Sequence, residues 1–104
     1  MQITTTDAVE SALDSVSFLL FKHSLRCGVS DRAFAEYEAF LTEHEMESAW
    51  IDVVADRALS KLVAEKTGVE HKSPQALLIR RGKVTWHASH FEITGEALAT
   101  AIEA

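Results

Sequence analysis

The sequence predicts an α/β layer sandwich in which a four-stranded mixed sheet is flanked by helices. Two observations support this fold class. Short apolar segments alternate along the chain with segments of helical periodicity, and two strand-like segments near the C-terminus are joined by a tight turn. The run Phe18-Leu19-Leu20-Phe21 is continuously apolar, as is typical of a central strand that is covered on both faces. We therefore expect a parallel crossover in the first half of the chain and a β-hairpin in the second.

The first half of the chain is predicted to run helix, strand, helix, strand. Val9, Ala12 and Leu13 repeat with the i, i+3, i+4 spacing of a buried helical stripe. A longer stripe that includes Ala33 and Tyr37 predicts a second helix after the first strand. The expected elements are a helix at 6–14, a strand at 17–22, a helix from about 27 to 43 and a strand at 49–54.

The second half is predicted to run helix, strand, strand, helix. Asp56 is suited to cap the first of these helices, and Gly68 is suited to end it in the left-handed conformation. Gly82 lies in Arg80-Arg81-Gly82-Lys83, where a hairpin turn needs positive φ. The expected strands are 76–79 and 84–88, with Val84, Trp86 and Ala88 on one face, and a last helix starts near Thr94.

Composition and charge restrict the function classes. The 104 residues are predicted to form a single domain, 1–104, and their net charge of −6 gives little support to nucleic-acid binding. No stretch has the length and apolar character of a membrane span, so no membrane partner is expected. The chain has one cysteine and therefore no internal disulfide, which fits a reducing cytoplasm.

The single cysteine lies at the predicted junction between the first strand and the second helix. Cys27 and Ser30 form a C-x-x-S arrangement, with a serine where a second cysteine can stand. A thiol at a helix N-terminus faces free N–H groups that favour the thiolate, and Arg26 and Lys22 add positive charge nearby. Ser30 can donate a hydrogen bond to that thiolate, but its hydroxyl cannot resolve a mixed disulfide. These residues predict thiol–disulfide exchange in which the second sulfur comes from another molecule.

With these elements in place, the sequence resembles the thioredoxin superfamily, and more closely the YtxJ-type monothiol bacilliredoxins. The resemblance covers most of the chain from about Leu20 to Thr94, and it implies a thioredoxin-like fold and a thiol–disulfide oxidoreductase. One position departs from the family pattern, because Gly28 follows the cysteine where the family usually has proline. Four islands carry the match: Leu20-Phe21-Lys22-His23-Ser24 with Arg26-Cys27 and Val29-Ser30, Asp52-Val53 with Arg57-Ala58-Leu59-Ser60, Gly68 to Gln75, and Trp86 to Thr94.

The resemblance also implies roles for other residues. The Ser73-Pro74 bond is expected to be cis and to lie opposite the cysteine, where the backbone of Ser73 can pair with a substrate. Ser89 and His90 precede the last helix on the same rim and are candidates, with His23, for binding a small thiol. The implied co-substrate is bacillithiol, and the implied partners are client proteins whose cysteines carry it as a cap.

Three alternatives remain open from the residues. The protein can act on glutathione caps, as glutaredoxins do. Cys27-Gly28-Val29-Ser30 is similar to the C-G-F-S motif of monothiol glutaredoxins, some of which carry iron–sulfur clusters with an added glutathione, so a non-enzymatic cluster carrier is a second alternative. The third is an interaction module with an inert thiol. The histidine and cysteine spacings give only weak support to a metal site, so we expect no metal and no tightly bound cofactor.

Overall fold

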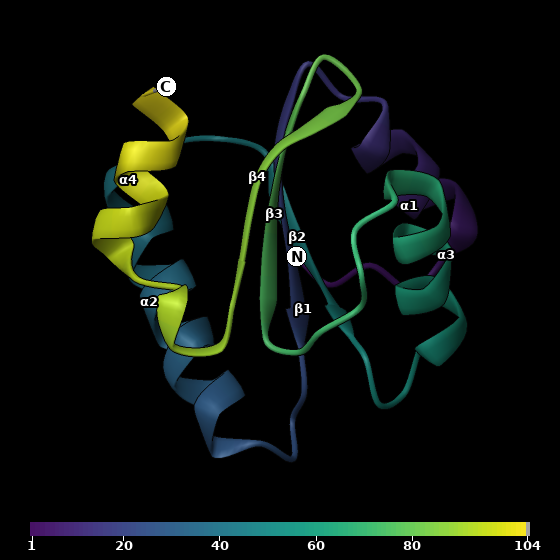
Figure 1. Cartoon of the computed structure of the whole chain (residues 1–104), viewed down its shortest axis with the longest axis horizontal. Coiled ribbons are helices and arrows are strands. Elements are labelled where there is room, and N and C mark those ends of the chain that lie inside the picture. The colour runs from purple at the N-terminus through teal and green to yellow at the C-terminus, as the bar shows by residue number, and fades with distance from the viewer. Residues whose placement is uncertain (104) are drawn as a thin grey trace.

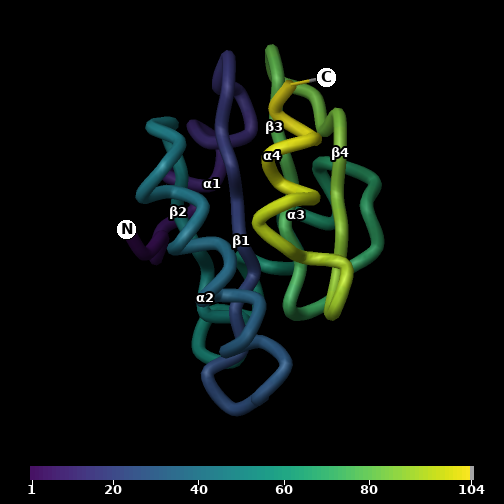
Figure 2. Tube along the Cα trace, turned by 90° about the vertical axis from the view of Figure 1, so that its left-hand side faces the viewer, coloured from purple at the N-terminus to yellow at the C-terminus, as the bar shows by residue number. Residues whose placement is uncertain are grey.

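The computed structural model describes residues 1–103 and places one mixed sheet between two pairs of helices (Figure 1). The strand order is β2-β1-β3-β4, in which β1 runs parallel to β2 and antiparallel to β3, while β3 and β4 form a hairpin. Helices α1 and α3 cover one face of the sheet, and α2 and α4 cover the other; the second pair lies in front of the strands in Figure 2. The predicted fold class is confirmed.

The elements begin and end within a few residues of the predicted positions. The bounds are α1 Thr6–Leu13, β1 Ser17–His23, α2 Gly28–Glu43, β2 Ser48–Asp52, α3 Arg57–Thr67, β3 Gln75–Arg80, β4 Lys83–Ser89, the 3-10 helix η1 His90–Glu92 and α4 Gly95–Glu103. Gly68 ends α3 with φ of 75°, and Gly82 has the same φ in the hairpin turn, so both glycines occupy the left-handed region as predicted. Asp56 stands at the start of α3, but its side chain makes no capping hydrogen bond.

Two apolar clusters hold the helices against the sheet. The side chains of β1 alternate between them: Leu20 packs toward α1 and α3, whereas Leu19 and Phe21 pack toward α2 and α4. All three are fully buried, which agrees with the continuously apolar run of a central strand. The same alternation continues to the end of β1, where Lys22 and His23 leave the strand on opposite faces of the sheet.

The prediction that Val84 shares a face with Trp86 and Ala88 is wrong. A bulge in the β3–β4 ladder pairs Leu78 with Trp86 but Ile79 with Val84. The extra residue shifts the alternation by one position. Val84 therefore packs on the cluster under α1 and α3, whereas Trp86 and Ala88 pack on the cluster under α2 and α4.

Candidate active site

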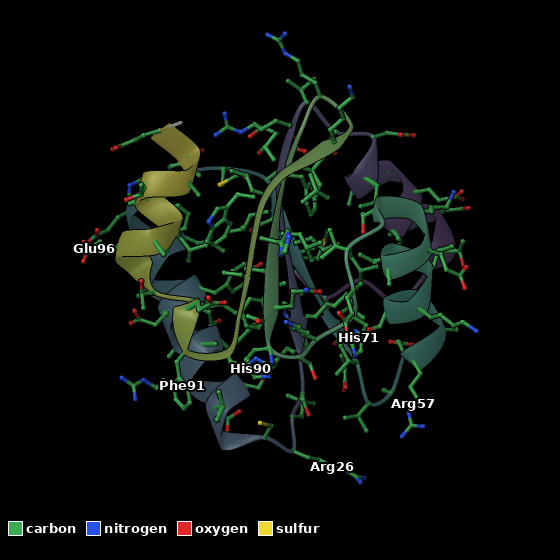
Figure 3. The ribbon with its side chains drawn as sticks, viewed as in Figure 1. Arg26, Arg57, His71, His90, Phe91 and Glu96 are labelled. Carbon is green, nitrogen blue, oxygen red and sulfur yellow. The ribbon has the colours of Figure 1, made fainter. Side chains whose placement is uncertain are left out.

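Cys27 is the N-cap residue of α2 and is partly exposed. Its backbone is extended, with φ of −125° and ψ of 121°, and its carbonyl accepts the N–H of Asp31 at 3.1 Å to close the first helical turn. The side chain makes no capping hydrogen bond, so the sulfur accepts no hydrogen bond from the free N–H groups of that turn. Figure 3 shows the loop before α2 at one end of the molecule, with Arg26 pointing away from the ribbon. The thiol therefore stands at an accessible helix N-terminus, as predicted.

Ser30 and His23 form a buried pair beneath this helical turn. The Ser30 hydroxyl oxygen lies 2.7 Å from Nδ1 of His23 and accepts the backbone N–H of Ser24 at 2.8 Å. Ser30 is fully buried and His23 is only 3% exposed. The pair ties the end of β1 to the first turn of α2, because His23 belongs to the strand and Ser30 to the helix.

The surroundings of His23 favour its neutral form. The imidazole stacks on Phe34 with ring centroids 4.3 Å apart and meets Trp50 edge-on at 5.5 Å. Burial lowers the pKa of His23, while the carboxylates of Asp31, Asp52 and Glu38 act in the opposite direction. Only Asp31 comes close, with Oδ1 at 4.0 Å from Nε2. Because His23 is only 3% exposed, its side chain is not placed to contact a small thiol directly.

Lys22 lies on the opposite face of the sheet and is fully buried. Its ammonium donates to the carbonyl oxygen of Ser60 at 3.2 Å and to Nδ1 of His71 at 3.1 Å. Since the ammonium has no lone pair, His71 accepts with Nδ1 and keeps its proton on Nε2. Burial lowers the pKa of Lys22 to about 8, and burial together with the Lys22 charge lowers the pKa of His71. No carboxylate within residues 1–103 lies within ion-pair distance of this ammonium.

The loop that carries the proline is joined to the short helix η1. The Ser73-Pro74 bond is cis, as the family resemblance implied, and the Pro74 carbonyl accepts the N–H of His90 at 3.0 Å. His90 is exposed and has φ of 54°. Ser89 is buried, and its backbone N–H donates to Glu92 at 3.4 Å. Ser73, Pro74 and His90 thus belong to one connected rim, in which His90 is exposed while Pro74 and the neighbouring Ser89 are buried.

Three residues outside the predicted site also lie at this end of the molecule. His71 accepts a hydrogen bond from the Lys22 ammonium, and the Arg32 guanidinium lies over the ring of Phe91 between η1 and α2. The labels of His71, His90 and Phe91 in Figure 3 are at the same end as Arg26. Phe91 and His71 both belong to sequence islands that carry the family resemblance. Their place in these islands is the sequence signal that could have marked them as site residues.

Two classes of feature are absent from the part of the chain that the structure covers. No group of three or more histidine, cysteine, aspartate and glutamate side chains within residues 1–103 is placed to hold a metal ion. None of the helices in the same residues has the length and apolar character that a membrane span requires.

The sequence matches the model of the monothiol bacilliredoxin family, BrxC, over residues 1–98. The chain belongs to this family. A solved structure of a thioredoxin-fold oxidoreductase is 31% identical, with 98% of this chain and 92% of that chain covered at a TM-score of 0.93. This monothiol bacilliredoxin family member is therefore a thiol–disulfide oxidoreductase, and the predicted family and enzyme class are confirmed.

Thioredoxins are similar to the bacilliredoxin chain in fold alone. A mutant thioredoxin from Halobacterium salinarum is 22% identical at a TM-score of 0.74, covering 98% of this chain and 85% of that one. Thioredoxin from Trypanosoma brucei brucei is 13% identical at a TM-score of 0.78, covering 99% of this chain and 87% of that one. Both matches extend over nearly the whole chain, which supports the thioredoxin-like arrangement of the sheet and helices.

Proposed function

We propose that the protein removes bacillithiol caps from client-protein cysteines through a mixed disulfide on Cys27. The observation that carries this proposal is the position of the only thiol of a monothiol bacilliredoxin at an accessible helix N-terminus. The N–H groups of the first turn and the positive end of the helix dipole both favour a thiolate there. A reducing cytoplasm, as indicated by the single cysteine, is the location in which we propose that it works.

The exchange proceeds in two displacement steps. The Cys27 thiolate attacks the cap sulfur of the client disulfide, the client sulfur leaves as a thiolate, and a Cys27–cap disulfide forms. A second molecule of low-molecular-weight thiol, as thiolate, then attacks the cap sulfur and leaves as the symmetrical disulfide, which returns the Cys27 thiolate. Each step breaks one S–S bond and forms another, so no further oxidant or reductant is needed. Ser30 offers no sulfur, and the second thiol must therefore come from solution.

Ser30 is proposed to stabilise the thiolate under the control of His23. When Nδ1 of His23 carries a proton, it donates to the Ser30 oxygen, and the hydroxyl proton is free to turn toward Cys27. When Nδ1 is bare, the hydroxyl donates to it instead. The contact of 2.7 Å thus links the hydrogen bond that Ser30 offers to the thiolate with the protonation of a buried imidazole.

The remaining candidates form the surroundings of the reacting sulfurs. We propose that Arg26 adds positive charge from the exposed loop. We propose that Lys22, by donating to Nδ1 of His71, orients that ring so that its Nε2–H is available to a substrate. Ser73 and Pro74 are proposed to shape the substrate groove. We propose that His90 contacts the cap and that Ser89 holds His90 in place from the end of β4.

The proposal is tested by presenting the reduced protein with one equivalent of a test protein capped by bacillithiol. A parallel sample uses the same test protein capped by glutathione. We expect the mass of the bacillithiol cap on the peptide that contains Cys27, and slower transfer of glutathione. Transfer of glutathione alone would move the protein to the glutaredoxin class of activity, and no transfer from either test protein would contradict both exchange functions.

A further inference from the structure

A small cavity lies between the first turns of α2 and the 3-10 helix η1. It measures about 150 Å³, and Val29 in the first turn of α2 is part of its wall. One of its lining residues is thus two positions from Cys27 in the same helical turn. His90 and Phe91 form its other wall. The backbone hydrogen bond from the N–H of His90 to the carbonyl of Pro74 joins this wall to the rim of the site.

The side chains around this cavity are chemically mixed. Phe91 is 66% exposed, which is unusual for a phenylalanine, and the guanidinium carbon of Arg32 lies 5.9 Å from the centre of its ring. Glu36 contributes a carboxylate that accepts the N–H of Gly95 at 3.0 Å. The cavity thus offers an aromatic face, a guanidinium and a carboxylate, and these groups suit a ligand that carries a ring, acidic groups and hydroxyl or amine donors.

From this arrangement we infer that the cavity binds the sugar and dicarboxylate end of a bacillithiol cap, an inference that rests on the proposed function. Bacillithiol joins its cysteine to an amino sugar that carries malate, whereas glutathione has carboxylates but no ring. The apolar face of a sugar ring can lie on Phe91, and Arg32 and His90 can donate to the malate carboxylates. Glu36 can accept from hydroxyl groups of the sugar.

The size of the cavity agrees with recognition of one part of the cap. Clefts that enclose a whole drug-sized ligand measure roughly 300–1,000 Å³. A cavity of about 150 Å³ has room for a single ring or a small diacid, so one of these two parts of the cap enters it while the other contacts the exposed Phe91 or Arg32 at its edge. Because Val29 is two residues from Cys27, we expect the cysteine end of the cap to extend from this wall of the cavity toward the thiol.

Binding without chemistry tests the inference directly. S-methyl bacillithiol cannot form a disulfide, so it is titrated into 15N-labelled protein and its affinity is measured from amide shifts. We expect saturable shifts at Val29, Arg32 and Ile93, and weaker binding of S-methyl glutathione. Phe91→Ala and Arg32→Gln are each expected to weaken binding about tenfold, which corresponds to about 1.4 kcal/mol. Both residues are exposed, so neither change is expected to disturb the fold.

Arg57→Gln is the matched control, because Arg57 is an exposed guanidinium at the same end of the molecule but at the start of α3 (Figure 3). This variant is expected to bind S-methyl bacillithiol as the wild type does. Shifts confined to other residues, or wild-type affinity in both Phe91→Ala and Arg32→Gln, would overturn the inference.

Cap transfer from a bacillithiol-capped test protein is measured on the same samples to separate the two proposals. Absence of transfer by the wild type would contradict the proposed function. Normal transfer by the wild type and by both cavity variants would contradict only the cavity assignment. The assignment would also be overturned if the two cavity variants lost cap transfer only from a folded client protein and still bound S-methyl bacillithiol as the wild type does. The cavity would then be a contact for the client rather than for the cap.

Discussion

Replacing Cys27 by serine is expected to reduce cap transfer to the rate of spontaneous exchange while leaving the protein folded. Position 27 holds the only sulfur that can attack a disulfide, and a hydroxyl cannot replace it in that step. Serine is a favoured N-cap residue, and the native cysteine makes no capping hydrogen bond. Cys27→Ser is therefore expected to raise the free energy of unfolding by about 0.5–1 kcal/mol.

The two effects of Cys27→Ser have opposite signs, which makes the result easy to interpret. Cap transfer is followed by intact mass, and stability is followed by urea unfolding of the same preparation. If Cys27→Ser lost both cap transfer and stability, unfolding of the variant would explain the lost transfer. Transfer by Cys27→Ser above the rate without protein would contradict the assignment of Cys27 as the nucleophile.

Replacing Lys22 by methionine is expected to stabilise the protein at neutral pH by about 1–2 kcal/mol. Burial lowers the pKa of Lys22 from 10.5 to about 8, and each pKa unit corresponds to about 1.4 kcal/mol of cost for burying the charged form. Methionine has a similar length and no charge, but it loses the hydrogen bonds to Ser60 and His71, each worth about 1 kcal/mol. The removed charge therefore outweighs the lost hydrogen bonds.

The pH dependence of this difference has a defined sign. Between pH 8 and pH 10.5 the unfolded chain keeps the Lys22 proton that the folded chain releases, so the stability of the wild type rises with pH in this window. Lys22→Met lacks this contribution, and its advantage over the wild type is expected to shrink as the pH rises. Burial raises the pKa of Tyr37, which acts above pH 10, but this contribution is common to both proteins and cancels.

Lys61→Met is the control for the Lys22 prediction, because the Lys61 side chain is 79% exposed. Its effect on the free energy of unfolding is expected to stay within about 0.5 kcal/mol. Urea unfolding of the three proteins at pH 7, 8 and 9.5 measures the differences. An unstable Lys22→Met protein, or an advantage that grows with pH, would contradict the account of Lys22 as a costly buried charge.

The elements of the fold follow from local signals, but the facing of some side chains does not. The apolar run of β1, the stop at Gly68 and the turn at Gly82 each depend on a few neighbouring residues, so the sequence predicts them well. The facing of Val84 depends on a bulge, which adds one residue without a sequence pattern that marks it. A strict alternation then assigns Val84 to the wrong face.

The sequence predicts the candidate site only in part, because some of its contacts depend on side-chain facing and on residues far apart in the chain. Cys27 and Ser30 follow from the helix start, and Pro74 follows from the family resemblance. Lys22, predicted as a positive charge near the thiol, and His23, predicted to bind a small thiol, are adjacent in sequence, yet strand alternation sends them to opposite faces of the sheet. The contact of Lys22 with His71 joins residues 49 positions apart, and only the folded chain brings them together.

The central claim is that exchange on one thiol stops at a mixed disulfide until a second thiol arrives. It is tested most directly by mixing the reduced protein with one equivalent of bacillithiol-capped test protein in the absence of any free thiol, and by following the mass of both proteins over time. We predict that the capped form on Cys27 accumulates to a constant level, set by the reversible exchange with the freed client thiol, and that the symmetrical disulfide forms only when bacillithiol is added. Failure of the cap to reach Cys27, or formation of the symmetrical disulfide without an added low-molecular-weight thiol, would contradict the account.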